Sequence, residues 1–193
     1  MANNNKSAKL HRAKERKRDE FYTRYEDIAA EAQHYWEEMR GKTIYCNCDT
    51  PSSNFVKYYT DNFKNIGLKK FIATGYRGEE ARGTYYIYDG ETITQGELEG
   101  NGSYDSPELD KYYEECDIIT TNPPFSKFGD YWNHIMSWGK EYLILGTVIQ
   151  SHYQKSVFPY IINGWTTIGY TGGSMLFDTP YDDDEDIAYK EKL

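Results

Sequence analysis

Short apolar runs alternate along this chain with segments whose apolar residues recur every three to four positions. The apolar runs are rich in β-branched residues and bounded by turn residues, which predicts strands buried on both faces; they are 43–48, 69–74, 116–120 and 142–148. The three-to-four spacing predicts helices over 27–39, 54–65, 107–115, 128–137 and 154–162. A serine at 52 or 53 is expected to cap the second helix, which ends before Gly67.

Two further pairs of extended segments complete the pattern. Residues 84–88 and 91–95 flank Asp89-Gly90, which predicts a hairpin with a two-residue turn. Residues 166–170 and 174–177 are predicted to form a terminal antiparallel strand pair. Strands alternating with helices indicate an α/β fold, a doubly wound and mostly parallel sheet with helices on both faces. Ligands of such a sheet bind beyond the carboxyl ends of its strands, so the residues that follow each strand are the candidates for chemistry.

Composition narrows the class of protein. The 193 residues fit one domain, and 17% aromatic residues, 20 of them Tyr, are enough to build a core. No run of about 20 apolar residues predicts a membrane helix, and the polar start predicts no secretory signal. Three cysteines are typical of reduced thiols, so a cytoplasmic protein is expected.

The net charge of -9 argues against a simple basic protein that coats DNA, but the charge is unevenly placed. Seven basic residues and one acidic residue lie between Lys6 and Arg18, whereas six acidic residues and two lysines lie between Tyr181 and Leu193. We therefore divide the chain into a basic N-terminal segment (1–18), a central domain (19–180) and an acidic tail (181–193). The basic segment is either a solvated end or a contact for phosphate groups.

The loop after the strand at 116–120 carries the most informative sequence, Asn122-Pro123-Pro124-Phe125. Two prolines fix two φ angles and remove two backbone donors, so the loop is rigid. It presents the Asn122 side chain and nearby carbonyl groups as fixed acceptors beside the Phe125 ring. A planar amino group needs such acceptors, and a base needs a ring on which to stack. An ordinary Asn-Pro turn is the structural alternative.

The loop resembles the catalytic motif of amino-group methyltransferases, and the rest of the chain resembles the EcoRI-type adenine-specific DNA methyltransferases. Arg18-Asp19-Glu20-Phe21-Tyr22-Thr23 is similar to the family's DEFYT element. Ile44 to Asp49, followed by Pro51 and Ser53-Asn54-Phe55, is similar to its YCNCD and SNF elements. Gly67-Leu68-Lys69-Lys70 and Gly100-Asn101-Gly102 also fit, and the resemblance extends from about Asn5 to Pro180. Longer members of the family continue past the equivalent of Pro180, with a part that carries target recognition.

The resemblance implies a Rossmann-like methyltransferase whose catalytic domain is 19–180. Such an enzyme uses S-adenosylmethionine to methylate N6 of a flipped-out adenine in double-stranded DNA. It would act in restriction-modification or phage DNA modification, in the cytoplasm of a bacterium or of a phage-infected cell. Asn122, Pro123, Pro124 and Phe125 are then the expected catalytic residues. The expected cofactor-binding residues are Phe21, Tyr22, Thr23, Asn47, Cys48, Asp49 and Asp105.

Alternative functions remain open from the sequence. An RNA or protein amino-group methyltransferase would use the same loop, and a short relative could instead be an inactive or regulatory partner. A second chain that supplies target recognition is also compatible with this length.

Individual residues have alternatives as well. Asp49 could instead stabilise a turn, and Asp105 could instead cap the helix that follows Pro107. Cys46 and Cys48 lack further ligands at metal-site spacing, so no metal is expected.

Overall fold

In a computed structural model of the chain, the described residues are 22–146, 155–171 and 177–178. The strands are β1 (Tyr22–Thr23), β2 (Thr43–Cys46), β3 (Lys70–Gly75), β4 (Thr84–Tyr88), β5 (Ile93–Glu97), β6 (Ile118–Thr121), β7 (Glu141–Ile144) and β8 (Phe177–Asp178). The α-helices are α2 (Tyr25–Ala32), α3 (Trp36–Met39), α4 (Asn54–Asp61), α5 (Phe63–Ile66), α6 (Asp110–Glu115), α7 (Phe128–Ser137) and α9 (Phe158–Ile162). Short 3-10 turns cover Gln33–Tyr35, Pro107–Leu109 and Phe125–Lys127.

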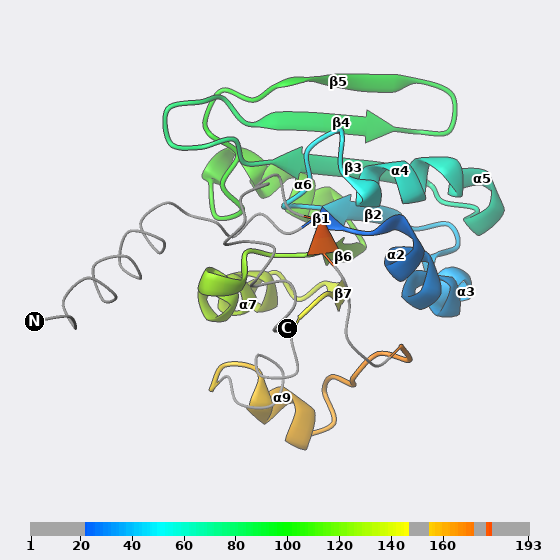
Figure 1. The fold of residues 1–193 in the computed structure, drawn as a ribbon, viewed down its shortest axis with the longest axis vertical. Helices are drawn as coiled ribbons and strands as arrows, with labels where there is room; N and C mark the ends of the chain where they lie inside the picture. Colours follow the sequence, from blue (N-terminus) through cyan, green and yellow to red (C-terminus); the bar gives the residue numbers. More distant parts are fainter. Residues whose placement is uncertain (1–21, 147–154, 172–176, 179–193) are drawn as a thin grey trace, which may run out of the picture.

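Six strands form one sheet in the order β5-β4-β3-β2-β6-β7 (Figure 1). Strands β3, β2, β6 and β7 are parallel to one another, and β4 and β5 extend the sheet beyond β3 in antiparallel pairing. A separate two-stranded antiparallel sheet joins β1 to β8. The mostly parallel α/β fold that the sequence predicts is therefore confirmed, with β5 and β7 at opposite edges.

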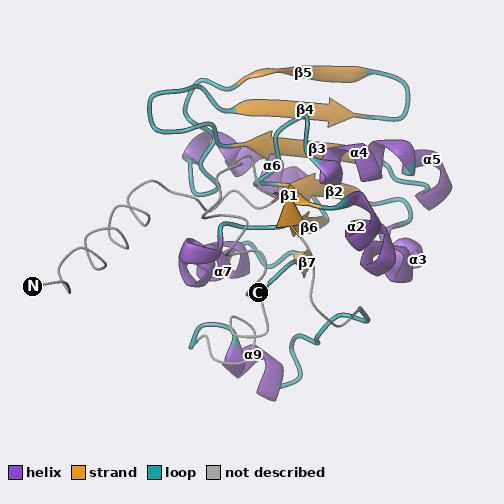
Figure 2. Cartoon of the chain, in the orientation of Figure 1, coloured by secondary structure: helices purple, strands orange, loops and turns teal. Residues whose placement is uncertain are grey.

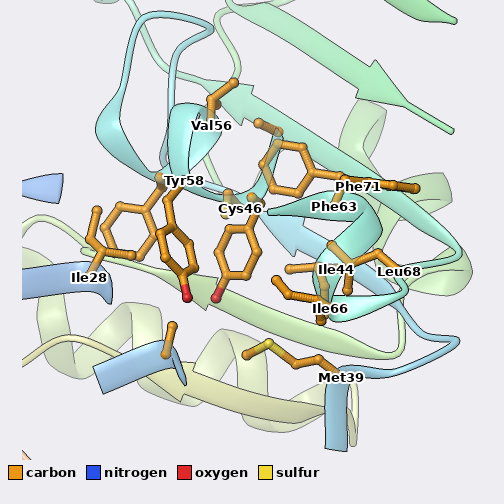
Figure 3. Packing of buried hydrophobic residues seen from close by; sticks show 14 of the residues in the cluster. Ile28, Met39, Ile44, Cys46, Val56, Tyr58, Phe63, Ile66, Leu68 and Phe71 are labelled. Carbon is orange, nitrogen blue, oxygen red and sulfur yellow. The ribbon is translucent and has the colours of Figure 1, made fainter. Parts of the chain in front are cut away.

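Each face of the sheet has its own hydrophobic core. Ile44 and Cys46 of β2 face the core under α2 to α5, and Tyr45 between them faces the core under α6 and α7. All four residues of β2 are buried because helices cover both faces, as Figure 2 shows. Figure 3 shows Val56 and Tyr58 of α4, Ile66 of α5 and Phe71 of β3 among the side chains of the first of these cores. The Tyr59 ring of α4 stacks on that of Phe71, with centroids 5.4 Å apart. Burial of such side chains stabilises by about 1.5–3 kcal/mol each, so β2 lies where the sheet is held most firmly.

Local signals set the ends of the helices as predicted. Ser53 caps α4, since its side chain accepts a hydrogen bond from the Val56 backbone at 3.2 Å. Gly67 ends α5 with φ 77°, a left-handed conformation that glycine adopts without a Cβ penalty. The predicted helix at 27–39 begins earlier, at Tyr25, and is divided by the 3-10 turn at Gln33–Tyr35.

Two sequence predictions are wrong. The turn at Asp89-Gly90 spans four residues and not two, because the Asp89 carboxylate accepts from the Glu91 and Thr92 backbones and β5 begins only at Ile93. Residues 166–170 form no strand, because the backbone donors of Tyr170 and Thr171 bond to the Glu31 carboxylate. The terminal antiparallel pair is instead β1 with β8.

Part of the C-terminal prediction lies outside the described residues. Of the helix predicted at 154–162, Phe158–Ile162 is helical, and residue 154 is not described. Residues 174–176 are likewise outside the described residues. No helix among the described residues is both long and apolar enough to cross a membrane.

Candidate active site

The candidate site lies where the crossover connections leave the sheet in opposite directions. From β2 the chain continues to β3 on one side, whereas β6 pairs with the other side of β2. Such a switch point leaves a crevice beyond the carboxyl ends of the two middle strands. The loop that begins at Asn47 follows β2, and the loop that begins at Asn122 follows β6. The fold therefore brings the two predicted elements to one edge.

Asp49 is a buried carboxylate at this edge. Its side chain is 6% exposed and accepts a hydrogen bond of 2.6 Å from the Thr121 hydroxyl, and its backbone N–H donates to the Thr74 carbonyl at 2.8 Å. Burial raises the pKa of Asp49 to about 6, although hydrogen bonds from Thr121 and Ser53 act in the opposite direction. No basic side chain contributes to that balance. The carboxylate is thus bonded only to hydroxyl groups and keeps an unbalanced negative charge when ionised.

The Asn122 to Phe125 segment leaves β6 as a tight loop. Pro123 is buried, Asn122 and Phe125 are half-buried, and a 3-10 turn begins at Phe125 and leads into α7. Thr121, the last residue of β6, accepts from the Leu145 backbone at 3.0 Å and so remains paired with the β7 side. The loop is therefore anchored on a strand at one end and on a helix at the other, which fixes its course.

Thr23 connects this loop to the opposite wall of the crevice. Its hydroxyl accepts a hydrogen bond of 3.1 Å from Nδ2 of Asn122, and its carbonyl accepts one of 2.9 Å from Nδ2 of Asn54 at the start of α4. Thr23 is 4% exposed and belongs to β1, which β8 holds from the other side. The bond from Nδ2 to Thr23 fixes the orientation of the Asn122 amide.

Both polar atoms of the Asn47 side chain are hydrogen-bonded to other residues of the protein. Its side chain is fully buried, donates to the Tyr113 hydroxyl at 2.7 Å and accepts from the Tyr131 hydroxyl at 2.9 Å. The Tyr113 hydroxyl in turn donates to the Tyr104 carbonyl at 2.7 Å. Asn47 therefore ties β2 to α6, α7 and the 103–105 loop, and only its backbone is left to meet a ligand.

Close backbone packing forms the rim beside Asp49. A Cβ on Gly75 would lie 2.8 Å from the Thr50 backbone nitrogen, and one on Gly102 would lie 2.7 Å from the Gly75 carbonyl. A Cβ on Gly83 would lie 2.6 Å from the Gly102 backbone. Because three glycines meet here, the 100–102 turn reaches the end of β3 and places Ser103 and Asp105 on the same side of the sheet.

We expect Gly102→Ala to lower the free energy of unfolding well beyond the loss in a matched glycine. Gly102 and Gly139 have φ 73° and 61°, but nothing lies within 4 Å of a Cβ on Gly139. The left-handed backbone costs alanine about 1–2 kcal/mol at both positions, and the clash adds about 1–3 kcal/mol at Gly102. Urea unfolding of Gly102→Ala and Gly139→Ala measures the two losses in free energy of unfolding. Equal losses would mean that the packing around Gly102 accommodates a Cβ.

A comparison with family profiles matches residues 9–192 to a family described as "Adenine-specific methyltransferase EcoRI". The chain belongs to the EcoRI adenine-specific methyltransferase family. It is 41% identical over 179 residues to the type II methyltransferase M.EcoRI of Escherichia coli, covering 83% of this chain and 55% of that protein. No solved structure gives a significant match.

Two mycoplasma proteins are also similar. Identity is 41% over 139 residues to the type II methyltransferase M.MpnI of Mycoplasma pneumoniae, covering 71% of this chain and 43% of that protein. It is 33% over 163 residues to the type II methyltransferase M.MgeORF184P of Mycoplasma genitalium, covering 84% and 51%. The chain therefore spans about half the length of the relatives that it matches.

The predicted site residues of this EcoRI-family chain are mostly brought together. Thr23, Cys48, Asp49 and the loop from Asn122 to Phe125 surround the carboxyl ends of β2 and β6. Asp105 is exposed and accepts from the Ser103 hydroxyl at 2.5 Å. Phe21 lies outside the described residues, and Tyr22 is described by its backbone alone, paired with Asp178.

Three polar residues of the site are absent from the sequence prediction. Thr121 bonds to Asp49, Ser53 bonds to Asp49 and caps α4, and Asn54 bonds to the Thr23 carbonyl. Thr121 could have been found as the polar residue that ends a buried strand next to the proline loop. Ser53 follows Asp49 by four residues and was predicted only as the cap of its helix, whereas Asn54 bonds to Thr23 across 31 positions, which no local pattern identifies.

The residues around Asp49 fit S-adenosylmethionine by their chemistry. Among the described residues the desolvated carboxylate has no cationic partner, so a ligand that carries positive charge and hydrogen-bond donors would stabilise its ionised form. Burial raises the pKa of the Cys48 thiol well above its ordinary value, so it is a neutral wall residue there. Within the described residues, no three His, Cys, Asp or Glu side chains gather as a metal site.

Proposed function

We propose that this chain carries the catalytic site of an adenine-specific DNA methyltransferase, which transfers a methyl group from S-adenosylmethionine to N6 of a flipped-out adenine. The observation that carries the proposal is the Asn122-Pro123-Pro124-Phe125 loop at the switch point, with the Asn122 amide fixed by Thr23 beside the buried Asp49. Family membership supports it, because the family description names adenine.

The acceptors of the loop act on the amino group of the base. Oδ1 of Asn122 and the Pro123 carbonyl accept its two hydrogens, which draws electron density from the N–H bonds toward nitrogen. A lone pair that is otherwise delocalised into the ring then becomes available for in-line attack on the methyl carbon. As the new N–C bond forms, the bond between the methyl carbon and the cofactor's sulfur would break and leave a neutral thioether, and the methylated nitrogen would then release one proton to water. Phe125 stacks on the base and offsets part of the cost of unstacking it.

Asp49 and the glycine rim hold the cofactor. When bound, S-adenosylmethionine supplies the methyl group in an activated, positively charged form. The Asp49 carboxylate accepts hydrogen bonds from its hydroxyl or amino groups, and Thr121 and Ser53 keep that carboxylate oriented. Thr23, Cys48 and the backbone of Asn47 line the same edge, and Asp105 approaches from the adjacent loop.

The test is a methyl-transfer assay with the purified chain and S-adenosylmethionine labelled in its methyl group. Unmethylated DNA, RNA and protein are offered separately and in competition, and mass spectrometry of digested product identifies the methylated group. We expect N6-methyladenine from DNA. Label in RNA or protein alone would contradict the proposal that DNA is the substrate. Cofactor binding without transfer to any of the three would contradict the proposal that this chain catalyses the reaction by itself.

We expect Thr23→Val to lower kcat by about 10- to 100-fold, whereas Thr23→Ser stays within about threefold of the unchanged chain. Valine has the shape of threonine but leaves Nδ2 of Asn122 without its hydroxyl acceptor, and such a loss costs about 1–3 kcal/mol. The KM for the cofactor should hardly change. A matching loss in both variants would show that Thr23 acts through its bulk and not through its hydroxyl.

A further inference from the structure

A buried amide and two buried tyrosine hydroxyls form a series of hydrogen bonds at the end of β2. Nδ2 of Asn47 donates to the Tyr113 hydroxyl at 2.7 Å, and the Tyr131 hydroxyl donates to Oδ1 of Asn47 at 2.9 Å. A hydroxyl has one hydrogen to donate, and that of Tyr113 goes to the Tyr104 carbonyl at 2.7 Å. Donors and acceptors are therefore matched in one direction along the series, from the Tyr131 hydroxyl to the Tyr104 carbonyl.

The series is closed to water. Asn47, Tyr113 and Tyr131 are fully buried, and Tyr104 is 8% exposed. A hydrogen bond inside a protein is stronger than one in water, and a buried polar atom that loses its partner stays unsatisfied. Breaking any bond of the series therefore leaves a buried polar group unpaired, unless the segments that it joins move apart and admit water.

The Tyr131 end of the series reaches the loop that carries Asn122. Tyr131 is the fourth residue of α7, and the 3-10 turn that begins at Phe125 leads directly into that helix. Its bond to Asn47 joins the first turn of α7 to the residue that follows β2, two positions before Asp49. The bond therefore holds the loop after β6 in place relative to the loop after β2.

The other end of the series holds the loop at 103–105. Tyr113 belongs to α6, and its hydroxyl bonds to the carbonyl of Tyr104, the residue before Asp105. The turn at 100–102 precedes this loop and packs closely on the end of β3. Tyr113 therefore acts on the side of the site where we expect the cofactor, whereas Tyr131 acts on the side where we expect the base.

The rings of both tyrosines have contacts that do not depend on their hydroxyls. The Tyr113 ring stacks on that of Trp138 with centroids 4.9 Å apart, and the Tyr131 ring meets the edge of the Tyr104 ring at 5.1 Å. All four rings belong to or pack against the core under α6 and α7. Phenylalanine in place of either tyrosine keeps this packing, so the effect of one hydrogen bond can be measured separately.

We propose that Tyr131 and Tyr113 are positioning residues for opposite partners in methyl transfer, Tyr131 for the base and Tyr113 for the cofactor. This inference rests on the proposed function, because that function assigns the two loops their ligands. Reacting atoms have to lie about 3–3.5 Å apart, and a displacement of about 1 Å can lower a rate about 10²-fold. Without the bond to Asn47, α7 is free to shift by such a distance. Release of the 103–105 loop instead weakens contacts that are made before the reaction begins.

Phenylalanine variants test this division, with kcat and the KM for S-adenosylmethionine measured at saturating DNA. We expect Tyr131→Phe to lower kcat by about 10- to 30-fold and to keep KM within about twofold. We expect Tyr113→Phe to raise KM by about 5- to 20-fold and to keep kcat within about twofold. Tyr112→Phe is the matched control, because Tyr112 precedes Tyr113 in α6 and contacts Tyr45 through its ring. Both parameters should stay unchanged in the control.

A second measurement needs neither cofactor nor DNA. Hydrogen–deuterium exchange of the ligand-free chain should rise at 125–131 in Tyr131→Phe and at 103–106 in Tyr113→Phe, and at neither place in Tyr112→Phe. Exchange that rises evenly over the whole chain or at neither segment would overturn the proposal, as would the same kinetic loss in both variants. If the unchanged chain transfers no methyl group, the proposed function fails, and the exchange pattern alone decides this proposal.

Discussion

Replacing Asn122 with alanine is expected to lower methyl transfer by about 10²- to 10³-fold while leaving cofactor binding within about twofold. The variant removes the Oδ1 acceptor, and the amino group keeps only the Pro123 carbonyl. The cofactor contacts of Asp49 are unaffected, because Asp49 bonds to Thr121 and Ser53 and not to Asn122. Initial rates at saturating DNA and calorimetric titration with the cofactor separate the two effects.

Asn65→Ala is the control for that variant, since Asn65 is an exposed asparagine of α5 remote from the carboxyl ends of the strands. Its rate should equal that of the unchanged chain. The thermal unfolding curve of Asn122→Ala shows whether losing the bond to Thr23 unsettles the fold. A variant that stays folded and retains more than a third of the rate would remove Asn122 from the catalytic step.

The second large effect is expected in the pH dependence of cofactor binding. The pKa of Asp49 in the folded chain without ligand is about 6, against an ordinary 3.8. Its ionised form is the one that accepts the cofactor's hydrogen bonds, so binding below pH 6 has to displace a proton. Affinity should fall about tenfold per pH unit below 6 and level off above it. Titrations at pH 5.0, 6.0 and 7.5 measure this.

Asp49→Asn separates binding from stability. The amide is neutral at every pH, so the slope should disappear and the affinity at pH 7.5 should fall by about 10- to 100-fold. The folding stability of the ligand-free chain depends on pH in the opposite direction from cofactor affinity. The raised pKa means that the ligand-free fold favours the protonated form, so stability is full below about pH 4 and declines as pH rises through 6, by about 3 kcal/mol for a shift of about two pH units.

The Asp49→Asn variant should accordingly be more stable than the unchanged chain at pH 7.5 in the absence of cofactor. Asp61→Asn, which alters a carboxylate paired with Lys57 on the surface of α4, is the control and should alter neither property. An unchanged pH slope in Asp49→Asn would assign the dependence to another group. A less stable Asp49→Asn would mean that the ionised carboxylate is already compensated in the ligand-free fold.

Buried strands and their order in the chain follow from the sequence. A strand covered on both faces is largely apolar, and that condition identifies β2, β3 and β6 within two residues at each end. The rigid loop after β6 is equally local, because two prolines restrict their own backbone. The strand predicted at 166–170 is absent, because the backbone donors of Tyr170 and Thr171 bond to the distant Glu31 carboxylate and not to a partner strand.

In the candidate site, some residues are likewise identified by local sequence, and others depend on distant partners. Residue types and their position after strands identify Asp49 and Asn122, since chemistry in this fold lies at the carboxyl ends of the strands. The role of Asn47 was decided by the tertiary structure, because its two tyrosine partners come from α6 and α7, 66 and 84 positions away. Thr23 likewise meets Asn122 across 99 positions. Backbone preferences act within a few residues, so the sequence by itself determined the fold class and the rigid proline loop after β6. Hydrogen bonds that orient a side chain depend on where folding brings distant segments, so the tertiary structure alone decided which groups hold that loop.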